Sequence, residues 1–165
     1  MRILLVDDEP AILEMLTAAC TSDGHDVVAC TSSLEALDYL QTHKIDLLIT
    51  DVAMPPPDGL QLVREAKGAA PNLLAIVITG YSSRYTLQDV LACGASDLMF
   101  KPFRIPELKA RIALADERRR AFETMHERRR QLQQVSAEMI HGLEEELADA
   151  NRHGIDAGRL RQKAS

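Results

Sequence analysis

Tryptophan is absent from this 165-residue chain, and aromatic residues make up only 4% of it. A folded core must therefore consist of aliphatic side chains, which the 46% hydrophobic content can supply. No stretch approaches the ~20 consecutive apolar residues of a membrane-spanning helix. The apolar run at the start is also too short for a signal peptide, because Asp7 and Asp8 end it at once. The sequence therefore argues against a membrane association.

Cysteine is scarce as well. The three cysteines, Cys20, Cys30 and Cys93, match no metal-binding or redox spacing. An odd number without a disulfide framework is typical of a reducing compartment. We therefore expect a cytoplasmic protein.

Positive charge is deficient in the first two-thirds of the chain. Residues 1–106 hold 7 Lys/Arg and 14 Asp/Glu, whereas residues 107–165 hold 12 and 11. An acidic surface repels the phosphate backbone, and the nearly neutral tail offers little attraction to it. Nucleic acid is therefore not an expected partner.

Short apolar runs alternate along the chain with stretches of helical periodicity. The runs at residues 3–6, 27–30, 47–49, 73–78 and 98–100 are typical of strands buried on both faces. Ile12, Leu13 and Leu16 share a helical face before Gly24, and Ser33 is placed to cap the next helix. Five strand–helix pairs in alternation predict an α/β fold with a parallel sheet and helices on both faces.

Polar residues whose side chains could bind ligands or react follow four of the five predicted strands. Asp7 and Asp8 follow the first, Asp51 the third, Thr79 the fourth and Lys101 the fifth. The carboxyl ends of parallel strands meet at one edge, where ligands bind in such folds. Clustered carboxylates suit Mg²⁺, and the hydroxyl and ammonium groups suit a phosphoryl group held near a nucleophilic carboxylate. Each acid alone would be interpreted as a turn or cap residue, so the joint pattern carries the prediction.

At this point the sequence resembles the receiver domain of bacterial two-component response regulators. The resemblance covers about residues 2–115 and implies a flavodoxin-like fold with strand order 2-1-3-4-5. The matching segments are residues 3–10, 46–51, 54–55, 58–59, 77–80, 94–95 and 101–103.

The resemblance implies a role for each residue at the sheet edge. Asp51 would accept the phosphoryl group from a sensor histidine kinase or a phosphotransfer protein. Mg²⁺ would be held by Asp7, Asp8 and Asp51 and by the backbone carbonyl of Ala53. Thr79 and Lys101 would contact the phosphoryl oxygens, and the peptide bond before Pro102 would be cis. Such a domain is not an enzyme in the usual sense, but it assists its own phosphorylation and dephosphorylation.

Four positions depart from the family pattern. Leu98 stands where the family often has an aromatic switch residue, and Pro57 stands where it commonly has Met. Gly80 and Ala53 are small residues beside Thr79 and Asp51. The usual coupled rearrangement of threonine and aromatic residue is therefore not expected in this chain.

The tail is predicted to be a helical extension over residues 116–153, followed by a flexible segment over residues 154–165. No Gly or Pro occurs between Glu107 and Gly142. Apolar residues recur close to a heptad spacing, which favours a homodimeric coiled coil formed through this helix. The alternatives are a solvated linker helix and a helical hairpin that breaks near Gly142. His141 is interpreted as a surface residue, because its neighbours do not resemble a phosphohistidine motif.

The predicted function is a phosphorylation switch that controls dimerisation or partner binding through the tail. Two alternatives stay open: a non-phosphorylated pseudo-receiver that acts as an adaptor, and the regulatory half of a larger enzyme or transcription factor. A hydrolase with an Asp nucleophile is disfavoured, because it would need a second Asp where Ala53 stands.

Overall fold

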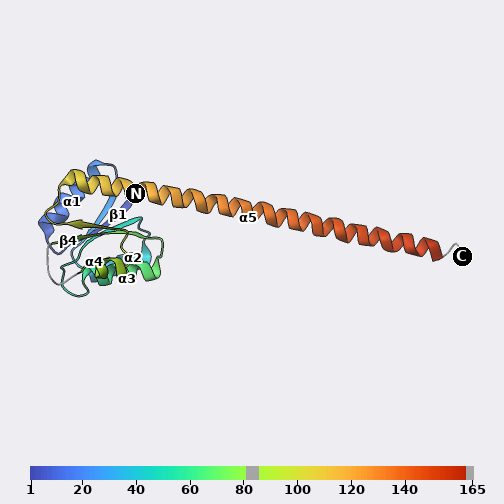
Figure 1. Cartoon of the computed structure of the whole chain (residues 1–165), viewed down its shortest axis with the longest axis horizontal. Helices are drawn as coiled ribbons and strands as arrows, with labels where there is room; N and C mark the ends of the chain where they lie inside the picture. Colours follow the sequence, from blue (N-terminus) through green and yellow to red (C-terminus); the bar gives the residue numbers. More distant parts are fainter. Residues whose placement is uncertain (81–85, 163–165) are drawn as a thin grey trace. The chain divides into compact units, whose positions relative to one another are not determined.

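The structure is a computed structural model that describes residues 1–80 and 86–162. It comprises two compact units, Met1–Arg119 and Arg120–Ser165, which are described separately. The first unit contains a five-stranded sheet, shown with its helices in Figure 1. The strands are β1 (Arg2–Val6), β2 (Asp26–Cys30), β3 (Leu47–Asp51), β4 (Leu74–Thr79) and β5 (Asp97–Phe100), and the helices are α1 (Pro10–Ser22), α2 (Ser33–Thr42), α3 (Gly59–Ala69), α4 (Leu87–Ala92) and α5 (Ile105–Gln162).

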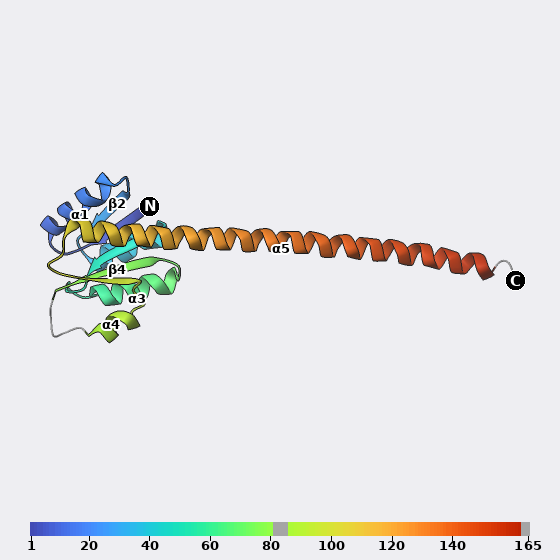
Figure 2. The same ribbon diagram turned by 45° about the horizontal axis from the view of Figure 1, so that its top comes forward.

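The sheet has the strand order β2-β1-β3-β4-β5, and every neighbouring pair is parallel. Helices α1 and the beginning of α5 cover one face, while α2, α3 and α4 cover the other (Figures 1 and 2). This arrangement confirms the predicted α/β fold and its strand order. The cis peptide bond expected between Lys101 and Pro102 is also present.

The core is aliphatic and lies in two layers, one on each side of the sheet. Successive residues of β1 alternate between the layers: Ile3 packs with α1 and α5, whereas Leu4 packs with α2 and α3. Both side chains are completely buried. Each strand therefore contributes apolar side chains to both faces, which explains why the strands appear in the sequence as continuous hydrophobic runs.

The cysteines are distributed between these two layers. Cys20 lies in the layer beneath α1 and α5, while Cys30 and Cys93 lie in the opposite one. All three are buried free thiols. Burial raises the pKa of Cys20 and of Cys30 to about 11, because the thiolate is poorly solvated there.

The prediction that Ser33 caps α2 is wrong by one residue. Ser32 is the N-cap, with an extended backbone and a side chain that accepts a hydrogen bond from the Glu35 amide. Ser33 is instead the first helical residue, and its buried hydroxyl has no hydrogen-bond partner. The error arises because two adjacent serines satisfy the same capping preference, and packing decides between them.

Helix α5 continues to Gln162, past residue 153, where the sequence predicted the start of a flexible segment. Gly154 and Gly158 do not stop it, since glycine within a helix costs only about 1 kcal/mol relative to alanine. Residues 163–165 lie outside the described part of the chain. Among the described residues, no helix combines the length and the apolarity needed to cross a membrane.

Candidate functional site

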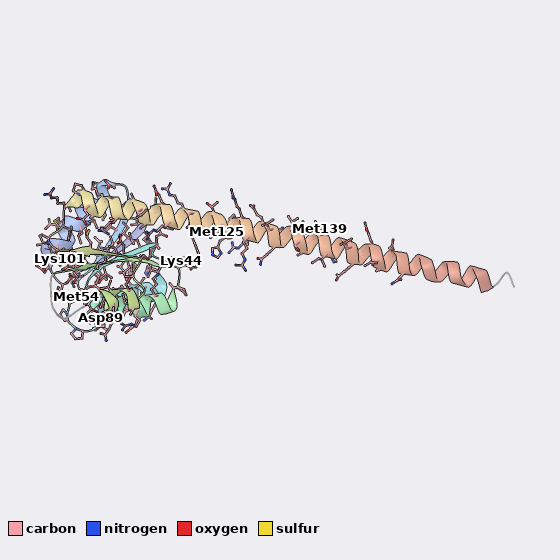
Figure 3. All side chains as sticks on the ribbon, in the orientation of Figure 1. Lys44, Met54, Asp89, Lys101, Met125 and Met139 are labelled. Carbon is pink, nitrogen blue, oxygen red and sulfur yellow. The ribbon has the colours of Figure 1, made fainter. Side chains whose placement is uncertain are left out.

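Three predicted site residues meet at the carboxyl edge of the sheet. Asp51 is the last residue of β3, Asp7 directly follows β1, and Lys101 directly follows β5. Because these strands are parallel, their ends lie at the same edge. Figure 3 labels Lys101 at this edge, and Lys44, which precedes β3, at the opposite end of the sheet.

The ammonium group of Lys101 joins the two buried carboxylates. Its Nζ donates a hydrogen bond of 3.1 Å to Asp7 Oδ2 and lies 3.0 Å from Asp51 Oδ1. Asp7 is 1% exposed and Asp51 is 5% exposed. The lysine supplies the positive charge that allows two buried acids to lie side by side.

The Asp51 carboxylate is held firmly on one side only. Its Oδ2 accepts a hydrogen bond of 2.9 Å from the Ala53 amide. Its Oδ1 is enclosed and receives no well-directed hydrogen bond, so the contact with Lys101 is one of charge. Oδ1 is thus balanced by the Lys101 ammonium alone, which leaves it available to a further ligand.

Burial and charge shift two pKa values at this edge. Burial raises the pKa of Asp7, although the Glu9 amide and Lys101 both act to lower it. Burial acts to lower the pKa of Lys101, but the Asp51 and Asp7 carboxylates outweigh it, and the net pKa is raised. At neutral pH the site therefore holds a cationic lysine beside an aspartate whose ionised form is disfavoured.

Replacing Asp7 by asparagine is expected to stabilise the fold at neutral pH in the absence of divalent cations. The folded chain binds the Asp7 proton more tightly than the unfolded chain, so ionised Asp7 lowers the free energy of unfolding above its raised pKa. The gain in the free energy of unfolding should shrink as the pH falls toward 3.8, the ordinary pKa of an aspartate. Urea unfolding of both proteins across this pH range measures the effect. A variant less stable than the wild type at pH 7 contradicts it.

Thr79 reaches the edge from β4, but its hydroxyl points into its own loop. Thr79 Oγ1 donates a hydrogen bond of 3.0 Å to the Gly80 carbonyl. The backbone amide of Lys101 donates a 2.7 Å hydrogen bond to the Thr79 carbonyl. The ends of β4 and β5 are therefore tied together, whereas the hydroxyl is not directed at Asp51.

Two further acids follow Asp7. Asp8 has an exposed side chain without a hydrogen bond or ion pair among the described residues. Glu9 was not proposed as a site residue, yet its Oε1 lies 3.9 Å from Lys101 Nζ and its amide donates to Asp7 Oδ1. Its position directly after two acids was the available signal. Glu9 occupies the N-cap position of α1 without a side-chain capping hydrogen bond, and it adds negative charge at the rim of the site.

Gly59 at the start of α3 lies directly beneath Asp51. A Cβ atom at this position would overlap the backbone carbonyl of Asp51 and would crowd the Cα of Val52. The Gly59 amide also donates a hydrogen bond of 3.2 Å to the Val52 carbonyl. Only a residue without a side chain allows α3 to begin this close to the end of β3.

The residues present fit a hard divalent cation. Among the side chains that the structure describes, no three acidic, histidine or cysteine groups are already gathered as a metal-binding group. Asp7 and Asp51 nevertheless supply adjacent buried oxygens, one of them without a hydrogen bond, and Asp8 follows in the chain. Mg²⁺ retains several waters and needs only one or two protein carboxylates, so this donor set suits it.

Leu98 lies on β5, opposite Val77 of β4. It is half-buried and packs against the apolar layer under α2 and α3. A leucine at this position adds to the packing of the sheet edge and offers no polar side-chain group.

Comparison with known proteins agrees with this architecture. The response regulator receiver domain family matches residues 3–113. The response regulator MprA of Mycobacterium tuberculosis is 37% identical over 112 residues, which cover 68% of this chain and 49% of MprA. The virulence transcriptional regulatory protein PhoP of Salmonella typhimurium is 35% identical over 112 residues, covering 68% of this chain and 50% of PhoP. The chain thus spans about half the length of these curated relatives.

A CheY-like receiver domain protein of Methanospirillum hungatei has a similar solved structure. It superposes with a TM-score of 0.70 at 27% identity, covering 73% of this chain and 96% of that one. A receiver protein of Pseudomonas putida gives a TM-score of 0.63 at 32% identity, covering 68% and 94%. Fold, edge residues and family match agree: the chain belongs to the response regulator receiver domain family.

Proposed function

We propose that Asp51 accepts a phosphoryl group from the phosphohistidine of a sensor histidine kinase or phosphotransfer protein. The observation that carries the proposal is the enclosed Asp51 Oδ1, which receives no well-directed hydrogen bond and faces the Lys101 ammonium at 3.0 Å. A carboxylate arranged in this way is held in place and charge-balanced without being fully engaged. It is therefore prepared to act as a nucleophile.

In the transfer, a carboxylate oxygen of Asp51 forms a bond to phosphorus while the phosphorus–nitrogen bond of the donor breaks. The electron pair of that bond leaves with the imidazole nitrogen. Lys101 pairs with the negative charge on the transferred group, at a distance it can reach from its present contact with Asp51. Positioning and charge stabilisation supply most of the catalysis in such reactions.

In this proposal Mg²⁺ is held by Asp7, Asp8 and Asp51, together with the backbone carbonyl of Ala53. When bound, the ion neutralises charge on the phosphoryl oxygens. The chain itself holds the Asp51 carboxylate in place through the Ala53 amide, which donates a hydrogen bond of 2.9 Å to Oδ2.

The proposal implies a reducing cytoplasm as the place of action, in agreement with three free cysteines among the described residues.

The switch would start with Thr79. Its hydroxyl must leave the Gly80 carbonyl in order to donate to a phosphoryl oxygen, and the Lys101 amide is bonded to the Thr79 carbonyl. A rotation of Thr79 would therefore displace the end of β5, through the hydrogen bond from the Lys101 amide. Leu98 packs beside this connection, so the proposed signal passes through movement of the β4 and β5 ends rather than through an aromatic hydroxyl.

The domain would promote only its own phosphorylation and dephosphorylation. Ala53 and Gly80 are small residues beside Asp51 and Thr79, and a Cβ added at Gly80 would meet no atom of the described residues within 4 Å. Neither residue offers a side-chain amide or acid to orient an attacking water. We infer that loss of the phosphoryl group depends on Mg²⁺ and on access of water.

The proposed output is a change in homodimerisation or partner binding through α5. A second candidate is that the chain forms the regulatory half of a larger effector, since it spans about half the length of MprA and PhoP. The two proposals differ in the effector that α5 would control, and they share the same phosphorylation site.

Incubation with acetyl phosphate and Mg²⁺ is expected to add a single phosphoryl group, which intact-mass spectrometry detects. Peptide mapping after borohydride reduction should place it on Asp51, because an acyl phosphate is reduced there to an alcohol. EDTA should prevent the addition. A stable modification on a serine, threonine or histidine, or modification that survives EDTA unchanged, would overturn the assignment.

A further inference from the structure

The part of α5 that belongs to the second unit carries an exposed apolar stripe. Its side chains are well exposed, for example 64% for Met125 and 72% for Leu132. They recur at steps of three, four or seven residues, which keeps them on one face of the helix. The stripe consists of Phe122, Met125, Leu132, Val135, Met139, Leu143 and Leu147. Figure 3 labels two of its members, Met125 and Met139.

Two blocks of charge flank the middle of the stripe. Residues 128–130 are all arginine (the Arg triplet), and residues 144–146 are all glutamate (the Glu triplet). Within the described residues the Arg triplet forms no ion pair, and the Glu triplet forms only a contact of 3.5 Å between Glu145 and His141. Among the described side chains of its own helix, each triplet therefore has no ion-pair partner of opposite charge, apart from that one histidine.

We propose that this stretch of α5 pairs with the same stretch of a second copy in antiparallel orientation, with the two-fold axis passing near residue 137. The inference deepens the proposed homodimerisation through α5 and rests on it. The Arg triplet of each chain then lies beside the Glu triplet of the other. The centre of each Arg triplet is then level with the centre of the Glu triplet of the second copy, and this juxtaposition occurs twice because the interface is self-complementary.

The apolar residues in the middle of the stripe agree with this axis. Val135 of one chain faces Met139 of the other, and Leu132 faces the turn that holds Gly142 and Leu143. The centres of the two triplets lie at equal distances from residue 137, about 12 Å along the helix at the usual rise. Apolar contacts thus occupy the middle of the interface, and opposite charges lie at equal distances on either side.

A parallel pair would place like charges together. Both Arg triplets would then lie within the same turn of the two helices, with Arg129 directed into the apolar seam of both. Both Glu triplets would meet in the same way about four turns later. Like charges across a helical seam destabilise the pair and are used to exclude wrong partners. The charge pattern therefore selects the antiparallel orientation.

The test compares the full-length wild type with two variants by sedimentation equilibrium at low ionic strength. The first variant reverses only the Arg triplet: Arg128→Glu, Arg129→Glu and Arg130→Glu. The second variant adds reversal of the Glu triplet: Glu144→Arg, Glu145→Arg and Glu146→Arg. We expect the first variant to dissociate at least about tenfold more readily, and the second to recover most of the lost affinity, because several ion pairs each add a small contribution.

The outcomes separate the orientation from dimerisation itself. In a parallel pair the first variant exchanges one like-charge contact for another, so an unchanged dissociation constant overturns the antiparallel proposal. A wild type that stays monomeric at all concentrations, with or without beryllofluoride and Mg²⁺, overturns dimerisation through α5 and leaves phosphorylation of Asp51 untouched. Circular dichroism of all three proteins verifies that helix content is equal, so that the comparison reports association.

Discussion

The Asp51→Asn variant is expected to take up no phosphoryl group from acetyl phosphate and Mg²⁺ under conditions that label the wild type. Asparagine has nearly the same shape and retains an oxygen that can accept the Ala53 amide hydrogen bond. It lacks the negative carboxylate that attacks phosphorus, and it removes the partner of Lys101 at 3.0 Å. The loss should therefore be complete, with little effect on the fold.

An exposed acid outside the site provides the matched control. Asp38 lies on the surface of α2, and Asp38→Asn removes the same charge from the chain. Its labelling should equal that of the wild type. Labelling of Asp51→Asn at even a modest fraction of the wild-type level would show that another residue accepts the phosphoryl group, and the proposed site would then be abandoned.

Adding a single methyl group at Gly59 is expected to disturb both the fold and the site. In Gly59→Ala the new Cβ meets the backbone carbonyl of Asp51, and backbone atoms cannot move aside as a flexible side chain can. Overpacking of this kind costs about 1–3 kcal/mol and sometimes more. Since Asp51 must shift to make room, the rate of phosphorylation should fall together with the free energy of unfolding.

Gly68 offers a control within the same helix. It lies near the end of α3, and an added Cβ there would meet no atom of the described part of the chain within 4 Å. Gly68→Ala should leave phosphorylation unchanged and stabilise the protein by up to about 1 kcal/mol, because alanine favours the helix. Urea unfolding and acetyl phosphate labelling of both variants test the contrast. A Gly59→Ala protein as stable as Gly68→Ala contradicts the proposed crowding.

The fold was predictable because its signals are local and repeated. Each strand is an apolar run bounded by polar residues, and the alternation of strands and helices permits few topologies. The meeting of Asp7, Asp51 and Lys101 followed from the parallel sheet alone, since all three stand at strand ends. The strand order came from the family resemblance.

Features that depend on side-chain direction or on single positions were not predictable in the same way. The sequence placed Thr79 at the edge, but only the structure shows its hydroxyl bonded to the Gly80 carbonyl. The choice of Ser32 over Ser33 as the cap of α2 depends on which serine the core buries. The close approach of Gly59 to Asp51 depends on the path of the intervening loop, and no periodic pattern reports it.

Two of the buried cysteines, Cys20 and Cys30, can report local opening of the receiver through their reactivity. Cys20 is enclosed on one side of the sheet, and Cys30 on the other, and a pKa of about 11 keeps either thiol protonated and slow to react at neutral pH. A thiol-alkylating reagent can modify each one only when the helices above it lift away. The alkylation rates of Cys20 and Cys30 would thus measure separately how often the apolar layer on each side of the sheet opens, without any foreign probe in the chain.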